Sequence, residues 1–411
     1  MKQHLVKPEI DPEDYDFSTL EVLIIGNTRL FDQTIFSITI LERNLRILAN
    51  LGVSKVYLPN SIKENINHFL RRDFFKLFRI EIDFMENFLF STGNLVGVLS
   101  GDFVYDPRLI RNVFSKESAV ILVNEENAIC AKVSNIKKFK NIDDYNELLN
   151  RLNIRHIAFQ SINFYNRKLR KIVKPYIIKI TIKNEARAAE NIIFDSVYKG
   201  ATDFITKHVF PKPVKFLVKL ISPTGITPNM ITYFSIILSF GAIPFYYLGY
   251  FSIAIIMSYS MALLDSLDGK LARIKFQESE GGKYLDHVSD YVYLPIWWAV
   301  TGYYISNSEF FNDIGILNIV FVLCYLLDKL IAFIFRRRNK ISISDFKPID
   351  RFVRLFAFRR NSSVTAFLVG IIFFNQTIAF KIVFYLMSGT TAFHLYRLIV
   401  SFLVKKDSDR L

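Results

Sequence analysis

The sequence predicts a two-part fold: a cytoplasmic α/β domain in residues 1–195 and an all-α membrane domain of six transmembrane helices in residues 230–411, joined by an interfacial linker helix in residues 196–229. Three observations predict this fold. Short apolar runs alternate with charged ones through the first half, as in a soluble domain, whereas from about residue 230 the apolar stretches lengthen to membrane scale. Basic residues border those long stretches, as expected of membrane spans.

Segments typical of strands and helices alternate in the first domain. We expect a helix over residues 41–51 and strands over residues 21–25, 55–58, 95–102 and 118–123. Because the two kinds of segment alternate, the sequence predicts a mainly parallel sheet. The N-terminal residues MKQHLVKPEIDPEDYD lack the apolar core of a cleavable signal, so this domain should stay in the cytoplasm.

The linker before the first span interleaves cations with apolar side chains. Lys212, Lys215 and Lys219 alternate with valine, phenylalanine and leucine. A short amphipathic helix lying in the membrane interface fits this pattern. A solvated basic linker is the alternative.

Six apolar segments are expected to span the membrane: residues 231–249, 252–274, 282–304, 314–335, 362–376 and 379–404. The fifth is short for a bilayer. The connections near residue 250 and over residues 305–313 contain no Lys or Arg, whereas residues 275–281 and 336–361 carry mixed or basic charge. The positive-inside rule therefore predicts a multi-pass protein of the cell membrane with both termini in the cytoplasm.

The net charge of +14 is concentrated beside the apolar segments. This placement favours anionic membrane lipid as a partner and argues against nucleic acid. The two cysteines, Cys130 and Cys324, lie in different parts of the chain, so neither a disulfide framework nor a cysteine-based metal site is expected.

Four aspartates lie in or beside the second and third apolar segments: Asp265, Asp268, Asp286 and Asp290. A charged carboxylate near a membrane core is costly unless it is paired, bound to metal or facing water, so such a cluster indicates a functional site. Four carboxylates need about four compensating positive charges, and two divalent cations supply them. All-carboxylate ligands favour Mg²⁺, with Mn²⁺ as the alternative.

The spacing of these residues places them on facing stripes of two helices. Asp265, Asp268 and Arg273 fall within a sector of roughly 140° on one helix, together with Gly269 and Ala272. On the next helix, Gly282, Asp286 and Asp290 form an i, i+4, i+8 stripe. Two such helices would enclose a two-metal cage in which the small residues leave room for a ligand.

This pattern, D-x2-D-G-x2-A-R-x8-G-x3-D-x3-D, resembles the signature of the CDP-alcohol phosphotransferases, and all of its positions are occupied between Asp265 and Asp290. These integral membrane enzymes move a substituted phosphate from a CDP-linked donor to an acceptor hydroxyl and release CMP. The resemblance implies that Asp265, Asp268 and Asp286 are chiefly metal ligands. It implies that Asp290 is the general base and also touches a metal.

The resemblance also implies a CDP site. The segment from Thr227 to Thr232 resembles the T-P-N-x-x-T motif with which relatives contact CDP. The expected CDP-binding residues are Thr227, Pro228, Asn229, Thr232, Gly269, Arg273 and Ser279. Gly269 should leave space for the nucleotide and Arg273 should hold phosphate oxygens. For Ser279 the alternative is an ordinary loop serine.

Arg354 and Arg397 lie near places where relatives that accept inositol phosphate bind its phosphate. We expect them to hold an anionic acceptor. The alternatives are that Arg397 extends to the membrane surface, as long cationic side chains do, and that Arg354 binds lipid headgroups. A structural role is preferred for His287, which adjoins Asp286.

The first domain resembles the sugar-nucleotide nucleotidyltransferases at residues 26–30 and 100–102, where relatives place a metal-binding Asp. Ile25 and Asn27 replace two glycines of the nucleotide turn, and no lysine follows in residues 31–38. These departures predict a degenerate copy. A bifunctional enzyme whose first domain makes the CDP-alcohol is the alternative.

The combination of domains resembles the fused inositol-1-phosphate cytidylyltransferase and di-myo-inositol-phosphate-phosphate synthase, notably in residues 197–203, 271–279 and 347–356. The donor is either CDP-inositol or, in a phospholipid synthase, CDP-diacylglycerol, and we also expect a homodimer. An ion-coupled transporter is the remote alternative, because the later spans carry no second acidic cluster, only Asp328 beside Lys329.

Overall fold

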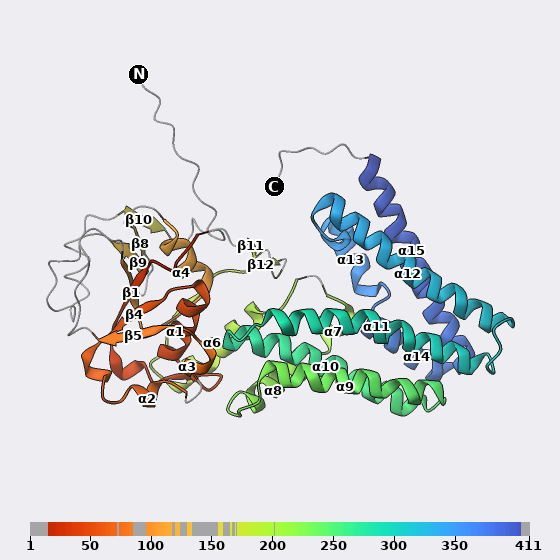
Figure 1. The fold of residues 1–411 in the computed structure, drawn as a ribbon, viewed down its shortest axis with the longest axis horizontal. Coiled ribbons are helices and arrows are strands. Elements are labelled where there is room, and N and C mark those ends of the chain that lie inside the picture. The colour runs from red at the N-terminus through yellow and green to blue at the C-terminus, as the bar shows by residue number, and fades with distance from the viewer. Residues whose placement is uncertain are drawn as a thin grey trace, which may run out of the picture. The chain divides into compact units, whose positions relative to one another are not determined.

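The computed structural model describes residues 15–71, 74–84, 96–116, 120–123, 130–133, 155–158, 165–166, 169, 171–200 and 202–403. The chain divides into two compact units (Figure 1). The first comprises residues 1–166, 172–196 and 274–277, and the second comprises residues 167–171, 197–273 and 278–411. The domain limits expected from the sequence stay predictions.

A seven-stranded sheet organises the first unit, in the order β10-β8-β9-β6-β1-β4-β5. Its strands are β1 (Glu21–Ile25), β4 (Lys55–Leu58), β5 (Glu81–Phe84), β6 (Val96–Ser100), β8 (Val120–Val123), β9 (Cys130–Val133) and β10 (Arg155–Ala158). β1 runs parallel to both β4 and β6, and β4–β5 and β8–β10 are also parallel pairs. Only β9 is antiparallel to its neighbours in this sheet, as far as the structure describes it. The mainly parallel sheet is therefore confirmed.

The helices of the first unit are α1 (Ile40–Leu51), α2 (Ile66–Phe69), α3 (Phe74–Leu77), α4 (Pro107–Phe114) and α6 (Lys183–Ser196). Short 3-10 turns lie at η1 (Thr28–Leu30) and η2 (Asn60–Ile62). Three short strand pairs lie outside the large sheet: β2 (Thr34–Ile35) with β3 (Ile38–Thr39), β7 (Phe103–Tyr105) with β13 (Ile177–Lys179), and β11 (Tyr165–Asn166) with β12 (Lys171–Ile172).

The expected elements of this unit form close to where the sequence predicts them. α1 begins because the Thr39 side chain accepts a hydrogen bond from the Glu42 amide, and it ends at Gly52, whose φ of 96° lies in the left-handed region. The expected third strand forms as β6. Leu95, and residues 118–119 of the expected fourth strand, lie outside the described residues. The antiparallel insertion of β9 was not predicted.

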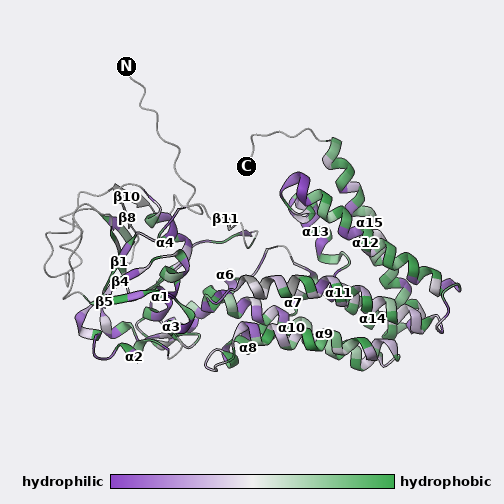
Figure 2. Ribbon diagram, in the orientation of Figure 1, coloured by the Kyte–Doolittle hydropathy of each residue, from purple (hydrophilic) through white to green (hydrophobic). Residues whose placement is uncertain are grey.

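The second unit is helical. Its elements are α7 (Phe204–His208), α8 (Pro211–Ile221), α9 (Pro228–Tyr247), α10 (Phe251–Lys275), α11 (Glu280–Ile305), α12 (Asp313–Asn339), η6 (Ile343–Asp345), α13 (Pro348–Phe356), α14 (Arg360–Phe373) and α15 (Gln376–Leu403). Each of the six segments expected to span the membrane is largely helical. In Figure 2 the hydrophilic α13 contrasts with the mainly hydrophobic α12 and α15.

Within the described residues, four of these helices are long and apolar enough to cross a membrane: α9, α10, α12 and α15. α13 and α14 pass the same test only as a pair, bent by 43°, which would give a fifth span. α11 has 26 residues but is not among them, and its first half carries the charged signature residues. The count of six spans stays a prediction.

Aromatic side chains form the core of the helical unit. Trp297 and Trp298 of α11 are fully buried, and both pack against Tyr246 of α9. Phe367 of α14 packs edge-on against Trp298. Burying several aromatic rings contributes strongly to stability because each removes a large apolar area from water. This core holds α9, α11 and α14 together beside the polar residues described next.

Candidate active site

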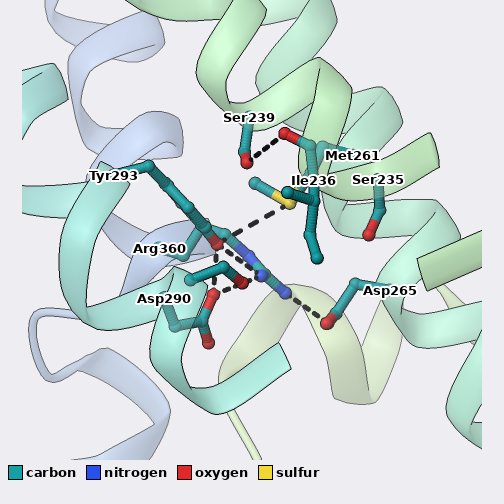
Figure 3. Close-up of a pocket in the computed structure, with 9 residues that line it drawn as sticks. Ser235, Ile236, Ser239, Met261, Asp265, Asp290, Tyr293 and Arg360 are labelled. Carbon is teal, nitrogen blue, oxygen red and sulfur yellow. Dashed lines mark hydrogen bonds and ion pairs between the residues drawn. The ribbon is translucent and has the colours of Figure 1, made fainter. Parts of the chain in front are cut away.

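Asp265 of α10 and Asp290 of α11 share one cation, Arg360, at the start of α14. The Arg360 guanidinium donates through Nη2 to Asp265 Oδ2 and through Nη1 to Asp290 Oδ1, the latter at 3.0 Å. Nη1 is also 2.8 Å from the Tyr293 hydroxyl, which itself hydrogen-bonds Asp290 Oδ1. Residues 265, 290 and 360 are far apart in sequence, so only the packing of three helices brings them together (Figure 3).

A small pocket surrounds this group. It is lined by Ser235, Ile236, Ser239, Met261, Asp265, Ser289, Asp290, Tyr293 and Arg360. The Asp290 side chain is 44% exposed, against 21% for Asp265 and 14% for Arg360. Asp290 is therefore the carboxylate of this pair that is more accessible from outside the pocket.

Asp268 lies one turn further along α10 and faces α9 instead. It is buried, and its Oδ2 accepts a hydrogen bond from the Thr232 hydroxyl. A buried carboxylate needs such a donor or a cation. The structure thus joins a predicted metal ligand to a predicted CDP-binding residue.

Asn229, Ser279 and Gly282 meet where α9 and α11 begin. The Ser279 hydroxyl donates to Asn229 Oδ1 at 3.0 Å and accepts from the Gly282 amide at 3.1 Å, so Ser279 is the N-cap of α11. A Cβ atom at Gly282 would lie 2.8 Å from Ser279 Oγ and 2.9 Å from Asn229 Oδ1. The absence of a side chain at Gly282 is what allows this close approach.

The remaining residues predicted to bind CDP lie at helix starts or beside the aspartates. Thr227 is the N-cap of α9, and Pro228 occupies its first turn. A Cβ atom at Gly269 would meet only the Arg273 guanidinium, at 3.5 Å, which is ordinary contact. The structure therefore does not require glycine at this position, and the expected role of Gly269 stays a prediction.

The donor set suits a hard divalent cation, because Asp265 and Asp290 already direct carboxylate oxygens at one positive group. Among the described side chains, no group of three or more His, Cys, Asp or Glu residues is gathered as a metal site. Asp286 lies on α11 four residues before Asp290, but its side chain and that of His287 lie outside the described part of the structure. Their expected roles stay predictions.

Arg397 and Arg354 both bind protein groups. Arg397 Nε donates to Asp350 Oδ1 at 2.5 Å, and both side chains are buried. Arg354 Nη1 donates to the Ser344 hydroxyl at 2.8 Å. The sequence suggested acceptor phosphate as the counter-charge of Arg397, but the structure supplies Asp350 of α13 instead. Whether either arginine also binds an acceptor stays a prediction.

Sequence reasoning missed Arg360 and Tyr293 as members of the site. The signal available was that Arg360 ends the basic stretch that borders the expected fifth span. Lys329 of α12 does not line the pocket but lies close to aromatic residues beside it. Its Nζ lies 4.6 Å from the Tyr325 ring centroid and 5.6 Å from that of Tyr291, one residue from Asp290.

In the first unit, the two segments that resemble nucleotidyltransferases are adjacent. The Gly101 amide donates to the Ile25 carbonyl at 2.6 Å, so the ends of β1 and β6 lie side by side. The Asn27 side chain accepts from the Arg29 amide at 3.1 Å and thereby caps η1. Burial raises the pKa of Asp102, which follows Gly101. A nucleotidyltransferase fold itself stays a prediction.

The second unit is thus a bundle of long apolar helices that directs Asp265 and Asp290 into one polar pocket. Residues 225–399 match the family CDP-alcohol phosphatidyltransferase, and this match supports an enzyme of that kind. The family is membrane-bound and generally depends on a divalent metal.

Among solved structures, the Mycobacterium tuberculosis phosphatidylinositol phosphate synthase with CDP-DAG bound is similar to this chain with 16% sequence identity and a TM-score of 0.37. The similarity covers 49% of this chain and 98% of that one. Because the TM-score is low, the assignment rests on the family match. The comparison with curated proteins gave no match.

Proposed function

We propose that this enzyme transfers a substituted phosphate from a CDP-alcohol to an acceptor hydroxyl and releases CMP. The observation that carries the proposal is the family match over residues 225–399, within which Asp265 and Asp290 point into one pocket. The remote alternative of an ion-coupled transporter has no comparable support.

The proposed metal site comprises Asp265, Asp268, Asp286 and Asp290, and Mg²⁺ is the expected ion, with two ions bound. Bound divalent cations would neutralise the diphosphate of the donor and the CMP that departs. Carboxylate oxygens are the ligands that Mg²⁺ prefers, and phosphate substrates complete its coordination.

The proposed CDP site is built on the starts of α9 and α11. Helix N-termini present free amide groups that attract phosphate. Asn229 and Ser279 support each other at these starts through their 3.0 Å hydrogen bond. Thr227, Pro228 and Thr232 would complete the site on α9, and Gly269 and Arg273 on α10 would leave room for and bind the diphosphate.

Asp290 is proposed as the general base. In the reaction, the acceptor oxygen forms a bond to the β-phosphorus while the bond from that phosphorus to the CMP oxygen breaks. The acceptor proton passes to the Asp290 carboxylate, which is the more accessible of the two paired aspartates. Proton removal should accompany attack, because a carboxylate beside cations is a weak base.

The acceptor is proposed to be an alcohol phosphate such as inositol phosphate, held by Arg354 and Arg397. Arginine binds phosphate through charge-assisted, bidentate hydrogen bonds. The donor is CDP-diacylglycerol or CDP-inositol. Six spans, cytoplasmic termini and a homodimer complete the proposal, and the first domain is proposed to be a degenerate nucleotidyltransferase of the fused inositol-1-phosphate cytidylyltransferase type.

The test is a donor and acceptor screen with membranes that contain the full chain. Each radiolabelled CDP donor is incubated with a panel of free alcohols and alcohol phosphates, and CMP release and product formation are measured with and without EDTA. We expect metal-dependent transfer to an alcohol phosphate. EDTA-resistant turnover would contradict the two-metal proposal, and a free alcohol as the best acceptor would contradict the anionic-acceptor proposal.

A further inference from the structure

Arg360 holds the two carboxylates on which the proposed metal site depends. Its two terminal nitrogens bind Asp265 Oδ2 and Asp290 Oδ1 separately, so the guanidinium bridges α10 and α11. In Figure 3 the guanidinium lies between the two carboxylates. This arrangement places a monovalent cation on oxygens that a divalent cation would need.

A guanidinium and a divalent cation compete for these carboxylates, because both bind them through oxygen. Mg²⁺ binds carboxylate oxygen at about 2.0–2.1 Å, and a second positive charge on the same oxygens would repel it strongly in a partly buried site. The Arg360 side chain is only 14% exposed, so water screens this repulsion weakly.

Hydrogen bonds anchor the start of α14, so we expect an exchange to involve the Arg360 side chain. The side-chain amide nitrogen Nδ2 of Asn361, the next residue, donates to Asp203 Oδ1 at 3.2 Å and to the Thr206 hydroxyl at 2.9 Å. Asp203 is buried and caps α7 by accepting from the Thr206 amide at 2.9 Å. The start of α14 is thereby tied to α7 within the second unit.

We propose that Arg360 is an internal counter-cation that competes with the divalent metal for Asp265 and Asp290, an inference that rests on the proposed metal site. Without metal, the guanidinium stabilises two carboxylates that would otherwise be costly to keep beside apolar helices. A metal that binds through Asp265 Oδ2 and Asp290 Oδ1 displaces Arg360 from both oxygens. The apparent metal affinity should therefore be lower than the intrinsic affinity of the carboxylates.

The size of the effect follows from the fraction of molecules in which the carboxylates are free. If Arg360 occupies them in at least nine tenths of the molecules, its removal should tighten binding by about 10-fold or more. The probe is Mn²⁺, titrated into the purified full-length protein in detergent without nucleotide and followed by electron paramagnetic resonance. This readout does not depend on catalysis.

Arg360→Gln is the test variant and Arg359→Gln is the matched control. Arg359 is adjacent and exposed and carries the same charge, so a general loss of positive charge would affect both variants alike. We expect Arg360→Gln to bind Mn²⁺ about 10-fold more tightly than the wild type and Arg359→Gln to match the wild type. Arg360→Lys keeps the charge but loses the two-pronged contact, so its affinity should lie between the two.

Equal or weaker binding by Arg360→Gln, in protein that elutes as a single folded species, would overturn the inference. Should that variant fail to fold, Arg360→Lys decides, and affinity equal to wild type would then count against the competition. Absence of Mn²⁺ binding by every variant would instead overturn the proposed metal site, so the two failures are distinguishable.

Discussion

At the residue scale, the surroundings of Asp290 and Asp265 differ. Both contact Arg360, but Asp290 is about twice as exposed and also accepts from Tyr293. An accessible carboxylate can meet an incoming hydroxyl, whereas a more enclosed one is better suited to hold a cation. This difference supports Asp290 as the base in the proposed reaction.

The Asp290→Asn substitution should separate binding from proton transfer. Because an amide cannot accept the proton, we expect CMP release to fall by about 10²–10⁴-fold, while donor binding measured by calorimetry changes little. Asp313→Asn, at an exposed helix start, should leave turnover unchanged. Turnover by Asp290→Asn near that of the wild type would rule out its role as base.

Arg397 gives a second prediction at this scale. Arg397→Ala should raise the acceptor KM by about 10-fold or more with little change in donor KM, if the side chain holds an anionic acceptor. The substitution also leaves Asp350 buried without its partner, and breaking a buried ion pair costs about 3–5 kcal/mol of stability. The kinetic and stability effects therefore need separate measurements.

Asp350→Asn provides the control for Arg397. It weakens the same ion pair but retains the arginine, so thermal stability should fall while acceptor KM stays near that of the wild type. If both variants raise acceptor KM equally, Arg397 acts only through its contact with Asp350. Steady-state kinetics with varied acceptor, together with thermal unfolding of each variant, decides between the two outcomes.

At the element scale, hydropathy locates the long helices well. The expected first span at residues 231–249 forms as α9 (Pro228–Tyr247), which Thr227 caps. The expected third span at residues 282–304 forms as α11 (Glu280–Ile305), which Ser279 caps. The apolar runs that predict these helices are local in sequence, whereas the capping roles of Thr227 and Ser279 emerge only from the structure.

The elements that the sequence failed to predict depend on contacts between distant residues. α13 has too few residues for a span, and its Asp350 is buried against Arg397, 47 residues later. The Asp265–Arg360 contact joins residues 95 apart, and β9 enters the sheet antiparallel between strands that run parallel to others. Periodicity within one segment carries no information about such partners.

Gly282→Ala tests the meeting of α9 and α11. The added methyl would lie 2.8 Å from Ser279 Oγ and 2.9 Å from Asn229 Oδ1, so these two side chains must move apart and lose their present positions. We expect donor affinity, measured by calorimetry, to fall by about 10-fold or more, since small misplacements of binding groups are costly. Gly281→Ala is the matched control, because nothing lies within 4 Å of its added methyl. If Gly282→Ala loses no more donor affinity than Gly281→Ala, the close approach of Ser279 and Asn229 to Gly282 is not needed for donor binding.

At the scale of the whole molecule, the open question is whether the first unit contributes a second activity. Its sheet brings Gly26 and Asn27 at the end of β1 beside Ser100 and Gly101 at the end of β6. Ligands of parallel α/β sheets bind at such carboxyl ends. The position therefore suits a nucleotide, and only the residues that occupy it argue against catalysis.

Those residues predict that the full chain does not make a CDP-alcohol from CTP. Ile25 and Asn27 stand where relatives have glycine, and the Asn27 side chain is engaged with the Arg29 amide, so the backbone of this turn cannot approach a triphosphate closely. No lysine follows in residues 31–38 to bind the triphosphate charge.

The full chain carrying Asp290→Asn should therefore accumulate no CDP-inositol from CTP, Mg²⁺ and inositol phosphate, as measured by chromatography against added standard. Accumulation that is lost when Asp102→Asn is added would instead make the protein bifunctional, with its first reaction at the end of β6. Accumulation unaffected by Asp102→Asn would assign the synthesis to other residues and would contradict the comparison with nucleotidyltransferases at this turn.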